Sequence, residues 1–274
     1  MDYARIIITG ASSGFGEAFA REAAQAARGQ CEIVLVARRR ERLESLAAEL
    51  TASNPKVCTR VLPCDLASPQ ARAELLHELA ALPPRRSLLI NNAGLGDYGE
   101  FMTAEPQRNN ELMQVNMLAL VELTRELLPQ LVKTGGDIIN IASLAADVFL
   151  PDFALYAASK AFVASFSEGL RLELRGQKVR VLVVCPGPVH TEFGSVAQRP
   201  GHDTGDMPLK KWFYTPIPVV VKGALRALHK GRARYYPSAK IWLSGCLLHI
   251  LPLWALRLIL CTRPRKVAQT PNQA

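Results

Sequence analysis

The stretch ARIIITGASSGFGEAFA, residues 4–20, opens the chain with an apolar run, a turn that contains three glycines and an alanine-rich segment. The run at 4–9 contains three consecutive isoleucines, which favour a buried strand. Residues 17–29 end at a glycine and predict a helix. A strand that leads through a glycine-rich turn into a helix is typical of the first unit of a parallel α/β sheet.

The three glycines of this turn suit a dinucleotide site. Gly10 permits a tight turn, Gly14 lets the backbone approach a pyrophosphate, and Gly16 lets the helix pack closely on the strand. The free N–H groups at the start of the helix attract phosphate. Three glycines also fit a purely structural loop, but their place after the first strand favours the dinucleotide. The cofactor-binding residues predicted here are Gly10, Ser12, Ser13, Gly14, Phe15 and Gly16.

Strands and helices alternate along most of the chain. Each predicted strand is a continuous apolar run, which indicates a sheet covered on both faces. We therefore predict a doubly wound parallel α/β fold in one domain at 1–237, followed by an apolar, basic C-terminal extension at 238–274. The other predicted strands are 32–39, 56–66, 87–94, 136–143 and 179–187, and the other helices are 41–50, 69–82, 107–133 and one that begins near Tyr156.

The composition fits a folded, reduced protein. Hydrophobic residues make up 49% of the chain, and no segment of roughly 20–50 residues repeats. The six cysteines form no Cys-x-x-Cys pair and have no histidine cluster nearby, which indicates reduced thiols and no metal site. The first strand begins almost at once, so we expect no signal peptide. These features predict a cytoplasmic protein, located at the inner face of the membrane if the extension binds lipid.

The end of the second predicted strand indicates which dinucleotide binds. An NAD site usually carries a carboxylate at this point for the ribose hydroxyls. Here Ala37 is followed by Arg38, Arg39 and Arg40. Ala37 cannot accept a hydrogen bond from a hydroxyl through its side chain, whereas Arg38 can form a bidentate contact with a 2′-phosphate. The predicted cofactor is NADP, and Arg40 is interpreted as part of a solvated helix start.

Tyr156 and Lys160 stand one helical turn apart. Hydride transfer between a nicotinamide and a carbonyl needs a proton donor or acceptor at the oxygen, and the pKa of free tyrosine, about 10, is high for this role. A cation one turn away is expected to lower that pKa. Ser143 closes the preceding strand, where its hydroxyl can bond the substrate oxygen. Asn116 is a candidate to hold a relay water, and an asparagine bonded to backbone is the alternative.

Seven motifs, in order, resemble those of the short-chain dehydrogenase/reductase family. They are TGASSGFG at 9–16, CDL at 64–66, NNAG at 91–94, Asn116, Ser143, YAASK at 156–160 and PGPVHT at 186–191. The resemblance covers about residues 4–195 of the chain. It implies a single-domain, Rossmann-type enzyme that forms dimers or tetramers and works through a Ser–Tyr–Lys core with an assisting Asn.

The resemblance also assigns a role to each motif residue. Tyr156 is the acid/base, and Ser143 polarises the carbonyl. Lys160 binds the ribose and tunes Tyr156, and Asn116 anchors the relay water. The family pattern places adenine at Asp65 and Leu66 and the ribose at Asn92, Ala93 and Gly94. It places the carboxamide at Pro186, Gly187, Val189 and Thr191.

The predicted activity is hydride transfer between NADP and a small hydrophobic ketone or secondary alcohol. The segment 194–216, which contains Pro and Gly, is the predicted substrate loop. A non-catalytic, NADP-sensing protein on the same fold is the alternative, and the joint presence of Ser143, Tyr156 and Lys160 argues against it. Nucleic-acid binding is disfavoured because the basic tail lacks interleaved aromatic residues and a reading motif.

The C-terminal extension is apolar and basic. From Met207 to Ala274 the chain carries twelve Lys or Arg and no Asp or Glu, which points to an anionic partner. Pro252 divides the apolar stretch and Arg257 would be costly inside a bilayer, so a full membrane span is disfavoured. Three interpretations stay open. They are peripheral membrane contact through 238–266, a cover over a hydrophobic substrate, and packing on the enzyme body or a second subunit.

Overall fold

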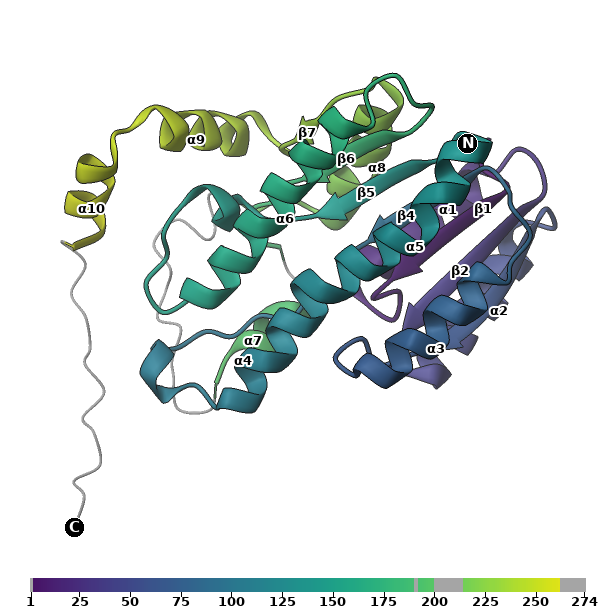
Figure 1. Cartoon of the computed structure of the whole chain (residues 1–274), viewed down its shortest axis with the longest axis horizontal. Coiled ribbons are helices and arrows are strands. Elements are labelled where there is room, and N and C mark those ends of the chain that lie inside the picture. Colours follow the sequence, from purple (N-terminus) through teal and green to yellow (C-terminus); the bar gives the residue numbers. More distant parts are fainter. Residues whose placement is uncertain (1, 190–191, 200–213, 262–274) are drawn as a thin grey trace, which may run out of the picture.

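Seven parallel strands form the central sheet, in the order β3-β2-β1-β4-β5-β6-β7. The computed structural model describes residues 2–189, 192–199 and 214–261. The fold confirms the predicted doubly wound α/β architecture (Figure 1). The strands are β1 (Arg5–Thr9), β2 (Cys31–Ala37), β3 (Val57–Pro63), β4 (Ser87–Asn91), β5 (Asp137–Ile141), β6 (Arg180–Val184) and β7 (Arg234–Tyr235).

Helices cover both faces of this sheet, and each face has its own apolar core. Ile6 and Ile8 of β1 belong to one core and Ile7 belongs to the other, because successive side chains of a strand point to opposite faces. Burial on both faces explains why the strands read as continuous apolar runs. One face carries α1 (Gly14–Ala26), α2 (Arg40–Ser53) and α8 (Ile217–His229), and the other carries α3 (Pro69–Ala80), α5 (Ala119–Thr134) and α6 (Ala154–Glu173).

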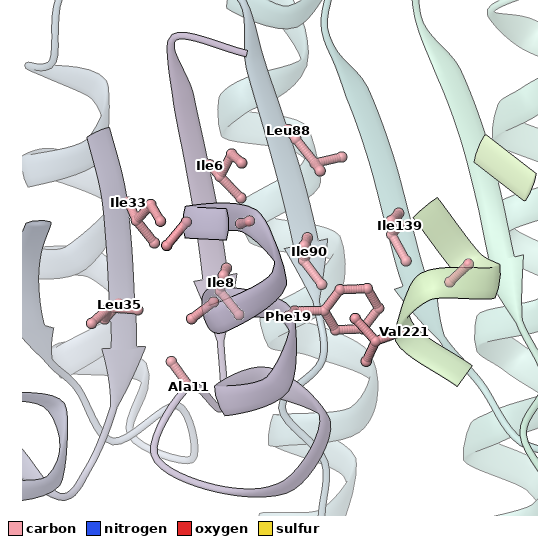
Figure 2. Packing of buried hydrophobic residues seen from close by; sticks show 14 of the residues in the cluster. Ile6, Ile8, Ala11, Phe19, Ile33, Leu35, Leu88, Ile90, Ile139 and Val221 are labelled. Carbon is pink, nitrogen blue, oxygen red and sulfur yellow. The ribbon is translucent and has the colours of Figure 1, made fainter. Parts of the chain in front are cut away.

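Phe19 of α1 is fully buried on the first face. Figure 2 shows its ring next to Ile90 of β4 and Val221 of α8. Val221 is 1% exposed, so α8 is part of the core. The sequence analysis assigned no helix to this segment and no strand to β7, which has only two residues. The sheet therefore has one strand more than the six predicted.

The order of the strands brings the loops after β1 and β4 together. β1 pairs with β2 on one side and with β4 on the other. The chain winds outward through β3 and then returns to the far side of β1, which creates a topological switch point. Ligands of open α/β sheets bind in the crevice at such a point, beyond the carboxyl ends of the strands.

The predicted helix at 107–133 is three consecutive segments. α4 (Pro106–Met113) passes into a π-helical turn, η2 (Gln114–Leu118), and then into α5. π-Helical turns occur frequently at functional sites because they reorient one turn of side chains. The remaining elements are η1 (Phe101–Thr103), η3 (Leu144–Asp147), α7 (Glu192–Ala197), α9 (Ala239–Ile250) and α10 (Leu253–Cys261). Among the residues described, none of the helices has both the length and the apolar character to cross a membrane.

Candidate active site

The glycine turn after β1 is held rigidly against the loop after β4. Gly10 and Gly14 have φ angles of 65° and 59°, which favour glycine. A Cβ on Gly16 would lie 2.2 Å from the carbonyl oxygen of Gly10, which confirms the close packing predicted for Gly16. The side-chain amide of Asn92 donates to the carbonyl oxygens of Thr9 (2.8 Å) and Gly10 (3.2 Å). Asn92 therefore fixes the turn through the turn's carbonyl oxygens and does not occupy the N–H groups at the start of α1, which a ligand can bind.

Thr9 is a positioning residue that the sequence analysis missed. Its hydroxyl oxygen accepts hydrogen bonds from the backbone N–H groups of Asn92 (2.9 Å) and Ala93 (3.0 Å). The loop that carries Asn92, Ala93 and Gly94 is thus tied to the end of β1. The sequence feature that could have identified Thr9 is its place, as a hydroxyl residue that ends the first strand directly before the glycine turn.

The three arginines after β2 differ in their partners. Arg39 donates to the Ser12 hydroxyl (3.1 Å) and forms an ion pair with Glu192 of α7 (2.9 Å). Arg40 pairs with Glu44 along the exposed face of α2 (3.5 Å), as expected of a solvated helix start. Arg38 is exposed and forms no ion pair in the part of the chain that the structure describes. Of the three, Arg38 has the guanidinium that is available to a phosphate.

The residues predicted at adenine and at the carboxamide lie near the same edge of the sheet. Asp65 is exposed, and its carboxylate accepts a hydrogen bond from the Ala67 N–H (3.1 Å). Leu66 is buried in the core under α3 and α5. The carbonyl oxygen of Pro186 accepts from the N–H of Leu144 (2.8 Å), which joins the loops after β5 and β6. Gly187 and Val189 follow, half-buried. The prediction for Thr191 lies outside the described residues.

Tyr156, Lys160 and Ser143 come together beyond the carboxyl end of β5. Tyr156 and Lys160 lie in the first turns of α6 and are 7% and 4% exposed. Ser143 precedes η3, its hydroxyl oxygen accepts from the Ala145 N–H (3.1 Å), and it also shares a hydrogen bond with the Tyr156 phenol. The Lys160 ammonium donates to the carbonyl oxygen of Ile141 (3.0 Å) and lies 5.7 Å from the Tyr156 ring centroid.

The pKa of Tyr156 moves in the direction opposite to our expectation. Burial raises it to about 12, and the hydrogen bond with Ser143 only partly opposes this. The prediction that Lys160 lowers this pKa was wrong for the protein alone, because the ammonium lies over the ring rather than at the hydroxyl and is itself desolvated. Burial lowers the pKa of Lys160 to about 8. Near neutral pH the phenol is protonated, and of the two groups Lys160 has the pKa closer to neutrality.

Asn116 lies in the π-helical turn and is 2% exposed. Its side-chain oxygen accepts from the N–H of Leu95 (2.7 Å), and its amide donates to the carbonyl oxygen of Leu95 (2.9 Å) and the Ser159 hydroxyl (2.9 Å). The alternative of an asparagine bonded to backbone is therefore correct. The bond from its amide to Ser159 also connects Asn116 to α6. A Cβ on Gly94 would lie 3.3 Å from the Lys160 ammonium and 3.5 Å from the Asn116 oxygen, so both groups border one small space.

Aromatic rings surround Tyr156, and the sequence analysis missed them. The ring of Phe153 stacks on it with centroids 4.2 Å apart, and Phe193 of α7 lies 5.5 Å away. Tyr98, from the loop after β4, contacts Phe153 edge-on at 5.6 Å. Phe153 was detectable as an aromatic residue three positions before Tyr156. Phe193 and Tyr98 are brought in only by the tertiary fold.

A buried carboxylate ties α7 to the loop after β4. Asp97 is 6% exposed and accepts from Arg108 of α4 (2.7 Å) and from Arg199, directly after α7 (2.8 Å). Burial raises the pKa of Asp97, but the hydrogen bonds from Arg199 and Arg108 prevail and hold it below its usual value. α7 also carries Phe193, so this cluster holds the helix whose ring contacts Tyr156.

Comparisons with known proteins agree with this geometry. Residues 4–200 match the family model for short chain dehydrogenase. Sulfoacetaldehyde reductase 2 of Chromohalobacter salexigens is 38% identical over 196 residues, which cover 69% of this chain and 73% of that protein. The family-model match spans the glycine turn, Ser143, Tyr156 and Lys160 and ends before α8.

Two solved structures resemble the chain over nearly its whole length. A short-chain dehydrogenase from Sphingobium yanoikuyae in complex with NADPH has a TM-score of 0.78 and 29% identity, covering 97% of this chain and 98% of that one. The bulky-bulky ketone specific alcohol dehydrogenase from Comamonas testosteroni has a TM-score of 0.72 and 27% identity, covering 98% of each chain.

Proposed function

The chain belongs to the short chain dehydrogenase family, and on that premise we propose that it transfers a hydride between NADP and a hydrophobic ketone or secondary alcohol. The observation that carries the proposal is the convergence of Ser143, Tyr156 and Lys160 beyond β5, next to the glycine turn. Residues 1–237 form the catalytic unit of this proposal, with residues 238–274 as an extension and a homo-oligomer as the assembled enzyme.

Three features support NADP as the cofactor. The glycine turn presents the start of α1, and the Ser13 side chain at its N-cap accepts no hydrogen bond from the helix. Arg38 offers a guanidinium for a 2′-phosphate at the point where Ala37 replaces a carboxylate. The structure from Sphingobium yanoikuyae is a complex with NADPH. When bound, NADPH supplies the hydride for reduction of a carbonyl, and NADP⁺ accepts it in the reverse direction.

The protein groups act on the carbonyl oxygen and its proton. The Ser143 hydroxyl donates a hydrogen bond to this oxygen and favours the charge that develops on it. The Tyr156 phenol, protonated because burial raises its pKa to about 12, donates the proton. Lys160 holds the ribose hydroxyls with the ammonium hydrogens that Ile141 leaves free. Asn116 and Lys160 border the space beside Gly94 where a relay water would be anchored.

The surroundings of Tyr156 support a hydrophobic substrate. Phe153 and Phe193 form an apolar wall against the catalytic ring, and a pocket lined by apolar side chains binds apolar ligands. The loops beyond this edge of the sheet also expose large apolar side chains: Phe101, Met102, Phe149 and Val196 are each more than half exposed. The structural relative from Comamonas testosteroni is specific for bulky-bulky ketones, which favours a large ketone here.

The proposal is tested with a panel of ketones from small polar to long-chain and polycyclic, with NADPH consumption measured by absorbance. We expect turnover to increase with the apolar size of the ketone. Tyr156→Phe keeps the ring and removes the proton, so turnover should fall by roughly 10²–10⁴. The matched control is Tyr235→Phe on β7, which should keep the parent rate. Turnover by Tyr156→Phe within a few fold of the parent would refute the role of Tyr156.

A further inference from the structure

α9 and α10 present a row of exposed apolar side chains. Figure 1 shows the two helices projecting from the sheet and its covering helices, with α10 farthest out. α9 is attached by its inner side, where Ile241 is fully buried and Gly245 lies against the Tyr236 ring. The apolar outer face, as we name it, consists of Trp242, Leu243, Leu247, Ile250, Trp254 and Leu258, which are between 54% and 78% exposed.

Such a face requires a partner. Apolar helix faces are normally buried, whereas among the α9 positions whose burial the structure describes Ile241 and Gly245 are the buried ones. Soluble monomers rarely expose contiguous apolar patches of this kind unless the patch binds something. The two tryptophans are also informative, because Trp is the side chain that prefers the boundary between a bilayer and water.

A cavity lined by two arginines adjoins the apolar outer face. It has a volume of about 410 Å³ and is lined by Arg232, Arg234, Tyr236, Ser238, Ala239 and Trp242. Asp147 and Glu168 pair with Arg234 (3.0 and 3.4 Å), whereas Arg232 is exposed and forms no ion pair among the described residues. The cavity also borders the first turn of α9, where the Ser238 hydroxyl accepts from the Ile241 N–H (3.3 Å) and the positive end of the helix dipole favours an anion. Trp242 belongs to both the cavity and the apolar outer face, so the Arg232 guanidinium and the apolar surface adjoin.

The charge pattern indicates which partner covers this surface. A second copy that docked through the same extension would place like charges against each other, because residues 207–274 contain no Asp or Glu to pair with Arg232 or Arg257. An anionic bilayer offers acyl chains for the apolar residues and phosphates for the basic ones. Figure 1 also places α9 and α10 toward the same end of the molecule as α4 and the carboxyl ends of the strands, where the active-site loops lie.

We propose that α9 and α10 bind the surface of an anionic phospholipid bilayer, with the apolar outer face in the interfacial region and a lipid phosphate in the Arg232 cavity. The six residues of the apolar outer face supply the apolar contact, and Arg232 supplies selectivity for negative headgroups. The proposal goes beyond the catalytic function, since lipid binding needs neither NADP nor a ketone. It can therefore fail or succeed independently of the proposed enzyme activity.

The test is cosedimentation of the full-length protein with vesicles of phosphatidylglycerol and phosphatidylcholine, compared with phosphatidylcholine alone. We expect binding to the anionic vesicles and weaker binding at high salt. Ile250→Ser should reduce the ratio of bound to free protein by roughly tenfold. Arg232→Ala should reduce it about fivefold on anionic vesicles, as for one basic residue at such a surface. Soluble glycerol phosphate should not release the protein, because it lacks the acyl chains.

Leu172→Ser is the matched control, because Leu172 of α6 is 70% exposed and lies outside the apolar outer face. It should bind vesicles like the parent. Thermal melting confirms that each variant folds, and light scattering without lipid measures self-association. The proposal is overturned if anionic and neutral vesicles bind equally, if Ile250→Ser binds as the parent does, or if Ile250→Ser instead converts a dimer to a monomer.

Discussion

Lys160 is a buried cation, and this has a measurable effect on stability. Burial lowers its pKa from 10.5 to about 8. Between about pH 8 and pH 10.5 the unfolded chain keeps the Lys160 proton that the folded chain has released, so the stability of the parent rises with pH in this window. Below about pH 8 the ammonium is charged in both states, and the full cost of burying it remains. Lys160→Met removes the charge and should increase the free energy of unfolding at pH 7 by on the order of 3 kcal/mol, with the advantage disappearing toward high pH.

Urea unfolding of the parent and of Lys160→Met at several pH values measures the difference in their free energies of unfolding. Lys230→Met, at an exposed position after α8, is the control and should change stability little at any pH. A Lys160→Met variant that is less stable than the parent at pH 7 would contradict the account of the buried ammonium. The same variant should have lost turnover, because Lys160 holds the ribose in the proposed function.

Arg38 tests the choice of cofactor. Arg38→Ala should weaken NADPH binding by roughly ten- to a hundredfold, which is the effect of losing charge-assisted hydrogen bonds worth about 1.5–3 kcal/mol. NADH binding should not change, since NADH has no 2′-phosphate. Arg40→Ala is the control, because Arg40 pairs with Glu44 and points along α2. Fluorescence titration gives both affinities, and an equal loss for NADPH and NADH in Arg38→Ala would argue against the assignment.

At the residue scale, the sequence predicted which side chains meet but not how they titrate. Tyr156, Lys160 and Ser143 were identifiable because spacing and motif order place them at one edge of the sheet. The raised pKa of Tyr156 depends on how deeply α6 is buried and on where the ammonium points, and neither is encoded in the interval of four residues. The contacts of Thr9 with Asn92 and Ala93 likewise join segments that are far apart in the sequence.

Among the elements, α7 depends on Asp97 for its position. Asp97→Asn leaves Arg199 and Arg108 without their carboxylate and should lower the free energy of unfolding by about 3–5 kcal/mol, as for other broken buried pairs. Because the cluster orients α7 and Phe193, the KM for ketone should rise more than the KM for NADPH. Glu49→Gln, which disrupts the exposed pair with Arg21, is the control and should cost less than about 1 kcal/mol.

Urea unfolding and steady-state kinetics of these two variants provide the measurements. Equal effects of Asp97→Asn on both KM values would mean that the cluster stabilises the fold without positioning α7 for the ketone. The pKa of Asp97 is held low by its partners, so the stability that the ion pair supplies is present above the unfolded pKa and is lost as pH falls through the lower folded value.

At the element scale, length and periodicity decided what was predictable. Most of the six longer strands carry an apolar run and were identified from it, whereas the edge strand β3 contains Thr59 and Arg60 and is only partly buried. β7 has two residues and no pattern of its own, and it exists because the backbone after α8 pairs with Val183 and Val184. The π-helical turn at Asn116 interrupts the predicted helix without any proline or glycine, so it depends on the bonds of Asn116 to Leu95 and Ser159.

For the whole molecule, the alternation of strands and helices was enough to predict the doubly wound fold. The boundary of the catalytic unit is less visible in sequence, because α8 packs its Val220 and Val221 into the same core as α1. The sequence showed that the C-terminal extension is apolar and basic, but it did not show where the extension lies on the fold. Its inner side is set by Ile241 against the body, and the exposure of Trp242 and Ile250 follows from that packing.

The central claim is hydride transfer from NADPH to a ketone, and an isotope measurement tests it most directly. The protein is incubated with NADPH that carries deuterium in the transferred position at C4 and with the best ketone of the panel, and the mass of the alcohol is determined. The account predicts one deuterium on the carbinol carbon, formed by the parent and strongly reduced in Tyr156→Phe. NADPH binding without any labelled alcohol, across the whole panel, would contradict it and favour a protein that only binds the dinucleotide.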